Sequence, residues 1–98
     1  MSDREVKERQ AVALVKMEAA EALKRNRHKG SWDTMPPREV AILLTGEVEE
    51  MAREIVAYHG AKGIHDKEAA RQRIFSEAGD VAAYLGILLE VLSHANSD

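Results

Sequence analysis

Two pairs of acidic residues interrupt segments that otherwise have the apolar pattern of core-facing helices. The pairs are Glu47 with Glu50 and Glu77 with Asp80, and the three-residue spacing within each pair places both members on one helix face. An ionised carboxylate inside a core costs several kcal/mol unless positive charge and hydrogen bonds compensate for it. Any fold of this chain must therefore supply positive charge at these positions.

The apolar neighbours of these acids form stripes at helical spacing. The stripe around Glu47 consists of Leu44, Val48, Met51 and Ile55. The stripe around Glu77 consists of Ile74, Val81, Leu85, Leu88 and Leu92. At about 100° per residue, Glu47 falls within the arc of the first stripe and Glu77 near the middle of the second. We expect both stripes to face the core.

The pattern predicts three long helices, over residues Arg4–Arg25, Pro37–Tyr58 and Lys67–Ser93. Pro37 fits the first turn of a helix, and Gly60 suits the C-terminal end of the second one. Asp66 is the expected N-cap of the last helix. Gly79 marks a bend, or a boundary that would divide the last helix and give four in all.

Gly79 and Gly86 are seven residues apart and share a face, which indicates close approach of another helix. Between Val81 and Leu92 only Glu90 is charged, so this segment is apolar nearly all round and should be buried on several sides. We therefore predict one all-α domain over residues 1–98, a helical bundle of three to four helices per chain that oligomerisation completes.

Composition narrows the class of protein. The 98 residues include no cysteine, which excludes disulfides and thiolate zinc sites. The formal net charge is −3 with mixed signs, so no nucleic acid polymer is expected as a partner. The charged N-terminus does not resemble a signal peptide, and no apolar run is long enough to cross a membrane. We expect a cytoplasmic protein with no membrane association.

Carboxylates that converge from two helices are typical ligands of magnesium, a hard cation that prefers oxygen. Two other interpretations are open. Glu47 and Glu77 could instead pair with arginines, of which Arg53, Arg71 and Arg73 are candidates, or lie at a hydrated subunit contact. A carboxylate-bridged di-iron bundle is less favoured, because it uses Glu-x-x-His motifs and neither acidic pair contains one.

A basic segment, Arg25-Asn-Arg27-His28-Lys29-Gly-Ser-Trp32, precedes the second helix. Such a loop can neutralise phosphates and stack on a base. For Arg25 and Arg27 we favour a role at the helix C-terminal dipole. Lys29 and Trp32 stay open between ligand contacts and structural roles, with Trp32 as a core residue in the second case.

Two further residues belong with this candidate site. Tyr84 follows Asp80 by one turn, so its ring should point the same way as the second acidic pair and could contact a ligand or the core. Among the histidines, His28 alone is expected near the site.

The motifs Glu47-Val-Glu-Glu50 and Glu77-Ala-Gly-Asp80, preceded by Lys29-Gly-Ser-Trp32 and a helix that opens after Pro36-Pro37, resemble the signature of a known family. These are the MazG-like all-α nucleoside triphosphate pyrophosphohydrolases, which include the dimeric dUTPases and dCTP pyrophosphatases. The resemblance extends over Lys29–Leu92.

The resemblance implies hydrolysis of a (deoxy)nucleoside triphosphate to the monophosphate and pyrophosphate with magnesium, or manganese in its place. The implied metal ligands are Glu47, Glu50, Glu77 and Asp80. Glu47 or Glu50 would activate water. Lys29 would contact the triphosphate, and Trp32 and Tyr84 the base or sugar. Relatives form dimers or tetramers, so a homodimer or homotetramer is expected. The alternatives are a non-enzymatic helical interaction or regulatory module, and a protein that binds nucleotide without turnover.

Overall fold

The computed structural model describes residues 1–95, and these form α-helices joined by short connections. The elements are α1 (Asp3–Arg25), the 3-10 turn η1 (Arg27–Lys29), α2 (Pro37–Gly60) and α3 (Ile64–Ala95). The all-α prediction is confirmed: the described part of the chain contains no strand. Its helices also lack an apolar stretch of the kind that crosses a bilayer.

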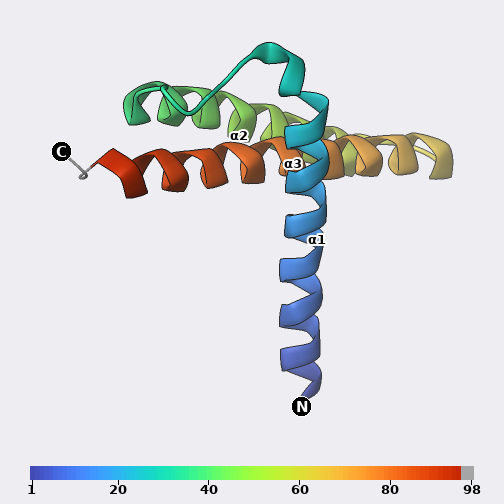
Figure 1. Ribbon diagram of the computed structural model, residues 1–98. Helices are drawn as coiled ribbons and strands as arrows, with labels where there is room; N and C mark the ends of the chain where they lie inside the picture. The colour runs from blue at the N-terminus through green and yellow to red at the C-terminus, as the bar shows by residue number, and fades with distance from the viewer. Residues whose placement is uncertain (96–98) are drawn as a thin grey trace.

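Helix α3 is the shared element of the fold. α2 runs beside it and α1 crosses it, whereas α1 and α2 do not pack on each other. Figure 1 shows α1 as the stem of a T, with its N-terminal half projecting away from the α2–α3 pair. Each residue from 3 to 17 is exposed, and Ala22 is the buried residue of α1. Only the C-terminal end of α1 therefore takes part in packing.

The N-terminal ends of the helices follow from their sequences. Ser2 caps α1 in a capping box with Glu5, which satisfies backbone donors that the first turn leaves unpaired. Pro37 opens α2 at a position where a missing N–H costs nothing. The predicted N-cap at Asp66 is wrong, because α3 begins at Ile64, and Asp66 lies within its first turn. Gly63 precedes it with φ 98°, a conformation that glycine adopts readily.

Gly79 lies at a close contact between α1 and α3. A Cβ built at Gly79 would lie 2.6 Å from the carbonyl oxygen of Glu18. The predicted close approach of a helix is therefore confirmed at Gly79, whereas a Cβ at Gly86 would meet nothing within 4 Å. The suggested division at Gly79 is wrong, since α3 continues through it to Ala95.

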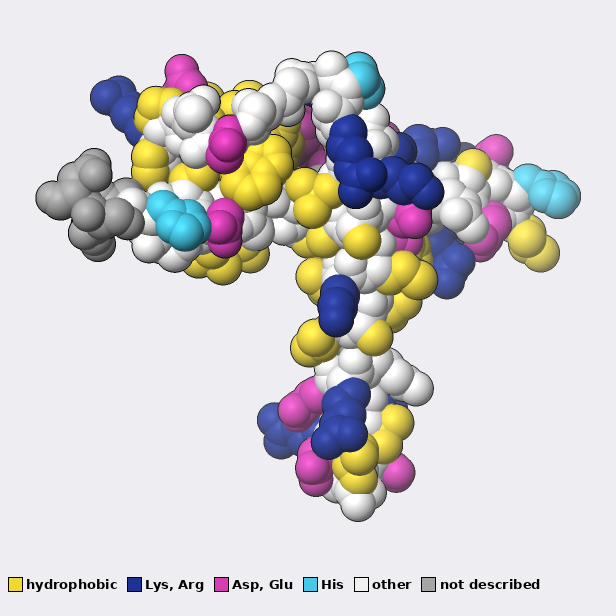
Figure 2. All heavy atoms as spheres, in the orientation of Figure 1, with side chains coloured by type: hydrophobic (Ala, Val, Ile, Leu, Met, Phe, Trp, Pro, Cys, Tyr) yellow, Lys and Arg dark blue, Asp and Glu magenta, His cyan; other side chains and the backbone are white. Residues whose placement is uncertain are grey.

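An apolar cluster joins the start of α2 to the C-terminal half of α3. Val40, Ile87 and Val91 are its buried members, and Trp32, Met35, Tyr84 and Leu88 pack against them. The predicted core stripes are only partly correct. Four of their residues, Val48, Ile55, Leu85 and Leu92, are 38–47% exposed. In Figure 2, hydrophobic side chains cover parts of the outer surface of α1 and of the α2–α3 pair.

Candidate functional site

The α2–α3 contact brings together three of the four predicted acidic ligands. Glu47 projects from α2, and Glu77 and Asp80 project from α3. Each offers a carboxylate oxygen, and these oxygens lie within 4.8 Å of one another. All three residues are partly buried. The structure therefore places carboxylates from two helices around one point, as the sequence pattern predicted.

The competing interpretation, pairing with arginine, requires a cationic partner for each buried carboxylate. Oε2 of Glu47 and Oε2 of Glu77 are buried, and neither accepts a hydrogen bond from residues 1–95. Two candidate arginines pair elsewhere: Arg71 with Glu68 at 3.2 Å, and Arg73 with Glu54 at 2.8 Å. Within the described chain, then, neither glutamate has the ion pair that would explain its burial.

Burial and mutual repulsion raise the pKa of both glutamates. The pKa of Glu47 is raised to about 7, mainly because burial disfavours the charged form, and further by the charges of Asp80, Glu50 and Glu77. The pKa of Glu77 is raised by burial first, then by the charges of Glu50 and Asp80. A hydrogen bond between the two carboxyl groups raises the pKa of Glu47 and lowers that of Glu77, so a proton that they share is held on Glu47. A pair of carboxyl groups that resist ionisation is one that a cation would stabilise.

Glu50, the fourth predicted ligand, occupies a different position. It is exposed on α2 and is not one of the three residues whose oxygens converge. Its charge still acts on both Glu47 and Glu77, whose pKa values it raises. Glu50 therefore lies at the solvent-exposed border of the acidic group, within hydrogen-bonding reach of the Glu77 side chain.

Asp80 differs from the two glutamates because it has a cationic partner. Arg25 Nη2, in the last turn of α1, lies 3.1 Å from Asp80 Oδ1. Both side chains are accessible, Arg25 at 44% and Asp80 at 21%. The sequence interpretation favoured a helix-dipole role for Arg25, and this contact across 55 positions was not foreseen.

A pocket of about 350 Å³ opens beside the acidic group. Its apolar lining comes from Ala22, Leu23, Trp32, Met35, Ala83, Tyr84 and Ile87. Its polar lining comes from Asn26, Arg27, Lys29, Ser31 and Asp80, with Gly30 between them. Asp80 belongs both to this pocket and to the three-carboxylate group. A ligand in the pocket would thus lie next to the carboxylates.

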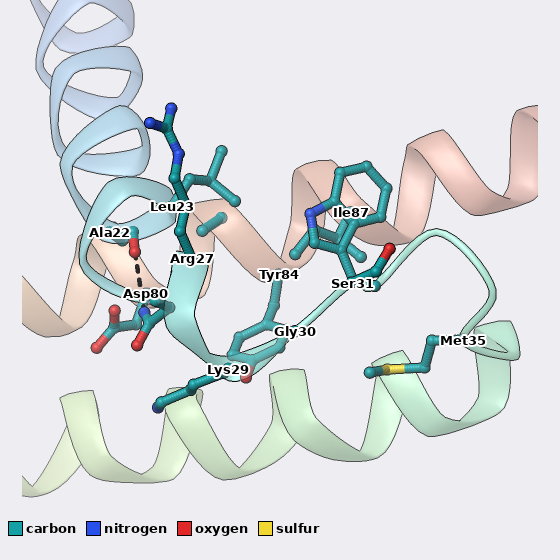
Figure 3. Close-up of a pocket in the computed structure, with 13 residues that line it drawn as sticks. Ala22, Leu23, Arg27, Lys29, Gly30, Ser31, Met35, Asp80, Tyr84 and Ile87 are labelled. Carbon is teal, nitrogen blue, oxygen red and sulfur yellow. Dashed lines mark hydrogen bonds between the residues drawn. The ribbon is translucent and has the colours of Figure 1, made fainter.

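The predicted ligand residues are distributed unequally around this pocket. Lys29, Trp32 and Tyr84 line it, and Trp32 also packs on the core, so its structural role is confirmed and its contact with a ligand stays a prediction. In Figure 3, Tyr84 reaches from α3 toward the loop at Gly30, and the side chains of Arg27 and Lys29 extend in different directions. His28 is exposed on η1 and is not among the lining residues, so its role stays a prediction.

Asn26 and Tyr84 show how the walls of the pocket are held. Asn26 ends α1 and donates its side-chain N–H to the carbonyl of Ala22 at 2.9 Å, the dashed line in Figure 3. The pKa of Tyr84 is raised by burial and by the charges of Glu47 and Asp80. Its hydroxyl is protonated at neutral pH, as in any tyrosine, and can donate a hydrogen bond. Sequence spacing could place Tyr84 near Asp80, but it carried no signal for Asn26 or Met35.

No protein-family model, curated protein or solved structure matches this chain. The resemblance to MazG-like enzymes therefore stays a prediction that depends on the residues quoted above.

Proposed function

We propose that this protein is a magnesium-dependent nucleoside triphosphate pyrophosphohydrolase, which converts a (deoxy)nucleoside triphosphate to the monophosphate and pyrophosphate. One observation carries the proposal: Glu47 and Glu77 bury carboxylate oxygens without donors, and Asp80 links them to a ligand-sized pocket. The cytoplasm, which contains both magnesium and nucleotides, is the expected place of action.

The residues fit a divalent cation in charge and spacing. Magnesium–oxygen distances of about 2.1 Å put oxygens on opposite sides of the ion about 4.2 Å apart. The oxygens of Glu47, Glu77 and Asp80 lie within 4.8 Å, so small side-chain movements bring them into range. Binding would remove the unfavourable burial of the two glutamates, and manganese, which also accepts oxygen ligands, would serve in its place.

The other side chains have roles that follow from their positions. A bound magnesium ion supplies charge that neutralises phosphate oxygens during attack by water. Glu50, at the exposed border of the acidic group, is the proposed base that accepts the proton from that water. The bond that breaks is a P–O bond of the α–β bridge, and pyrophosphate leaves. Lys29 would hold the triphosphate through its ammonium group.

The apolar part of the pocket is the proposed site for the base or sugar. Trp32 and Tyr84 offer ring surfaces there, and base–aromatic stacking contributes about 1–3 kcal/mol per base. The Tyr84 hydroxyl, which lines this pocket, would donate a hydrogen bond to the ligand. Lys29 and the carboxylates then lie on the side where phosphates would extend.

The test is pyrophosphate release from the common ribo- and deoxyribonucleoside triphosphates with magnesium. The wild type should release pyrophosphate from at least one of them. Asp80→Asn should lose both magnesium binding and turnover, whereas Glu50→Gln should lose turnover and retain magnesium binding. Full activity in both variants would contradict the proposed mechanism.

We also propose that two or four copies of the chain associate through α1. Residues 3–17 are all exposed in the described part of the chain, and an isolated helix of this length is marginal in water. Val12, Leu14, Val15 and Met17 are 45–67% exposed there. Sedimentation equilibrium should give a multiple of the 10.9 kDa chain mass. Val15→Glu should lower the measured mass of the assembly, and the neighbouring substitution Lys16→Gln should leave that mass unchanged.

The same exposed helix favours a second candidate function, a non-enzymatic interaction or regulatory module. The two candidates differ in their response to nucleotide. Magnesium-dependent thermal stabilisation by nucleoside triphosphates supports the enzyme, and its absence, together with binding of a different protein through α1, supports the module.

A further inference from the structure

We propose that Arg25 is an exchangeable counter-ion: it pairs with Asp80 when the metal is absent, and it contacts a phosphate of the ligand when the metal is bound. This inference rests on the proposed function and adds a residue that the motif resemblance does not contain. It predicts two effects of opposite sign for one substitution, which a purely structural ion pair would not produce.

The guanidinium group of Arg25 lies against one of the proposed metal ligands. Arg25 Nη2 is 3.1 Å from Asp80 Oδ1, so it occupies one oxygen of a proposed metal ligand. Among the ion pairs formed by residues 1–95, this is the one that involves the three-carboxylate group. The acidic group therefore has a positive neighbour, although that neighbour does not reach the buried oxygens of Glu47 and Glu77.

A cation at the carboxylates would repel this guanidinium. Like charges a few ångströms apart interact by about 1 to 4 kcal/mol per unit charge at effective dielectric constants of 80 to 20, and the ion carries two units. Arg25 can respond because its side chain is 44% exposed and flexible. The ion pair with Asp80 thus stabilises the metal-free state and opposes metal binding.

The displaced guanidinium would stay close to the ligand. Arg25 lies directly before the pocket residues Asn26 and Arg27, and Asp80 is itself part of the pocket lining. A phosphate bound next to Asp80 would replace one anionic partner of Arg25 with another. Guanidinium groups bind phosphate oxygens through two parallel N–H donors, a geometry that suits this exchange.

The experiment measures two affinities by calorimetry in the wild type, Arg25→Gln and Arg25→Lys. The first is the Kd of magnesium alone, and the second is the Kd of magnesium–inorganic triphosphate at saturating magnesium, a probe that needs no knowledge of the base. Lys24→Gln is the matched control: it removes the same charge from the same helix turn, and Lys24 forms no ion pair within residues 1–95.

Arg25→Gln should bind magnesium about three- to tenfold more tightly than the wild type, because the competing cation is gone. The same variant should bind magnesium–triphosphate about five- to thirtyfold more weakly, because a charge-assisted hydrogen bond is lost. Arg25→Lys should keep most of the wild-type magnesium affinity and recover part of the triphosphate affinity. Lys24→Gln should change both affinities by less than about twofold.

The outcomes separate this inference from the proposed function. If the wild type binds no magnesium, the metal site fails, and the role of Arg25 fails with it. If the wild type binds magnesium but Arg25→Gln binds it equally or less tightly, or leaves triphosphate affinity unchanged, the role of Arg25 alone is overturned. A weaker affinity for both probes would identify the pair as structural.

Discussion

Glu47 on α2 and Glu77 on α3 bring carboxylates together across the helix contact, and each has one buried oxygen that accepts no hydrogen bond from residues 1–95. We expect this relationship to weaken the metal-free fold and to favour cation binding, because the same charges that repel each other attract a divalent ion.

Stability of the metal-free protein should fall as the pH rises. The pKa of Glu47 is raised from 4.5 to about 7, and that of Glu77 is also raised, so the folded state holds more protons than the unfolded state in this window. With EDTA at fixed protein concentration, the Tm near pH 5 should exceed that near pH 7.5 by about 2–5 °C. An unchanged or rising Tm would show that these carboxylates are not destabilising.

Magnesium should reverse this trend. Protons compete with the metal for the same oxygens, so millimolar magnesium should raise the Tm more near pH 7.5 than near pH 5. Calcium-free buffers and an EDTA back-titration isolate the effect of magnesium. An equal increase in Tm at both pH values would indicate an effect of ionic strength rather than binding to Glu47 and Glu77.

Glu47→Gln should stabilise the metal-free protein and abolish its response to magnesium. The amide removes a charge that is buried without a partner, so the Tm in EDTA near neutral pH should rise by about 2–6 °C. Glu49→Gln is the control, because Glu49 is exposed on the same helix. This substitution should change neither the Tm in EDTA nor the response to magnesium. Destabilisation by Glu47→Gln in EDTA would mean that the carboxylate makes a favourable contact.

Gly79 and Gly86 provide a matched pair for the packing of α1 on α3. Gly79→Ala should destabilise by about 1–3 kcal/mol, because the new methyl group would collide with the backbone of Glu18. Gly86→Ala should stabilise by about 0.5–1 kcal/mol, since the site is open and alanine favours helix. Urea unfolding measures both. Equal effects of the two substitutions would contradict the crossing of α1 and α3 at Gly79.

Nucleotide binding should be visible through Trp32, the only tryptophan, which lines the pocket. A triphosphate that is a substrate should quench its fluorescence when magnesium is present. Tyr84→Phe should weaken that binding about three- to tenfold through loss of one donor. Tyr58→Phe is the control, because Tyr58 contacts Lys67 and does not line the pocket. Equal nucleotide affinities in the two variants would show that the Tyr84 hydroxyl does not contact the nucleotide.

The acidic group could be predicted because its signal is local. Glu47 and Glu77 interrupt apolar stripes, so helical periodicity alone predicts that they point inward, and the structure brings them together with Asp80. Tyr84 follows from its spacing to Asp80 in the same way. These residues lie on two long helices that run side by side, which leaves little freedom in how they meet.

The rest depends on contacts between distant segments. The pairing of Arg25 with Asp80 requires knowledge of where α1 crosses α3, and no local pattern encodes it. Val48 and Leu85 are exposed although the pattern predicted them on core-facing stripes. Periodicity identifies an apolar face of a helix, but it does not show which element, if any, covers that face. The predicted start of α3 at Lys67 is wrong because it relied on Asp66 as the N-cap. The helix instead begins at Ile64, directly after Gly63.

The most direct measurement is a calorimetric titration of magnesium into the metal-free protein near pH 7.5, with Glu77→Gln compared. The proposed function predicts one magnesium site per chain in the wild type and at least about a tenfold loss of affinity in the variant. Absence of binding in the wild type, or an unchanged Kd in Glu77→Gln, would contradict the assignment of these carboxylates to a metal.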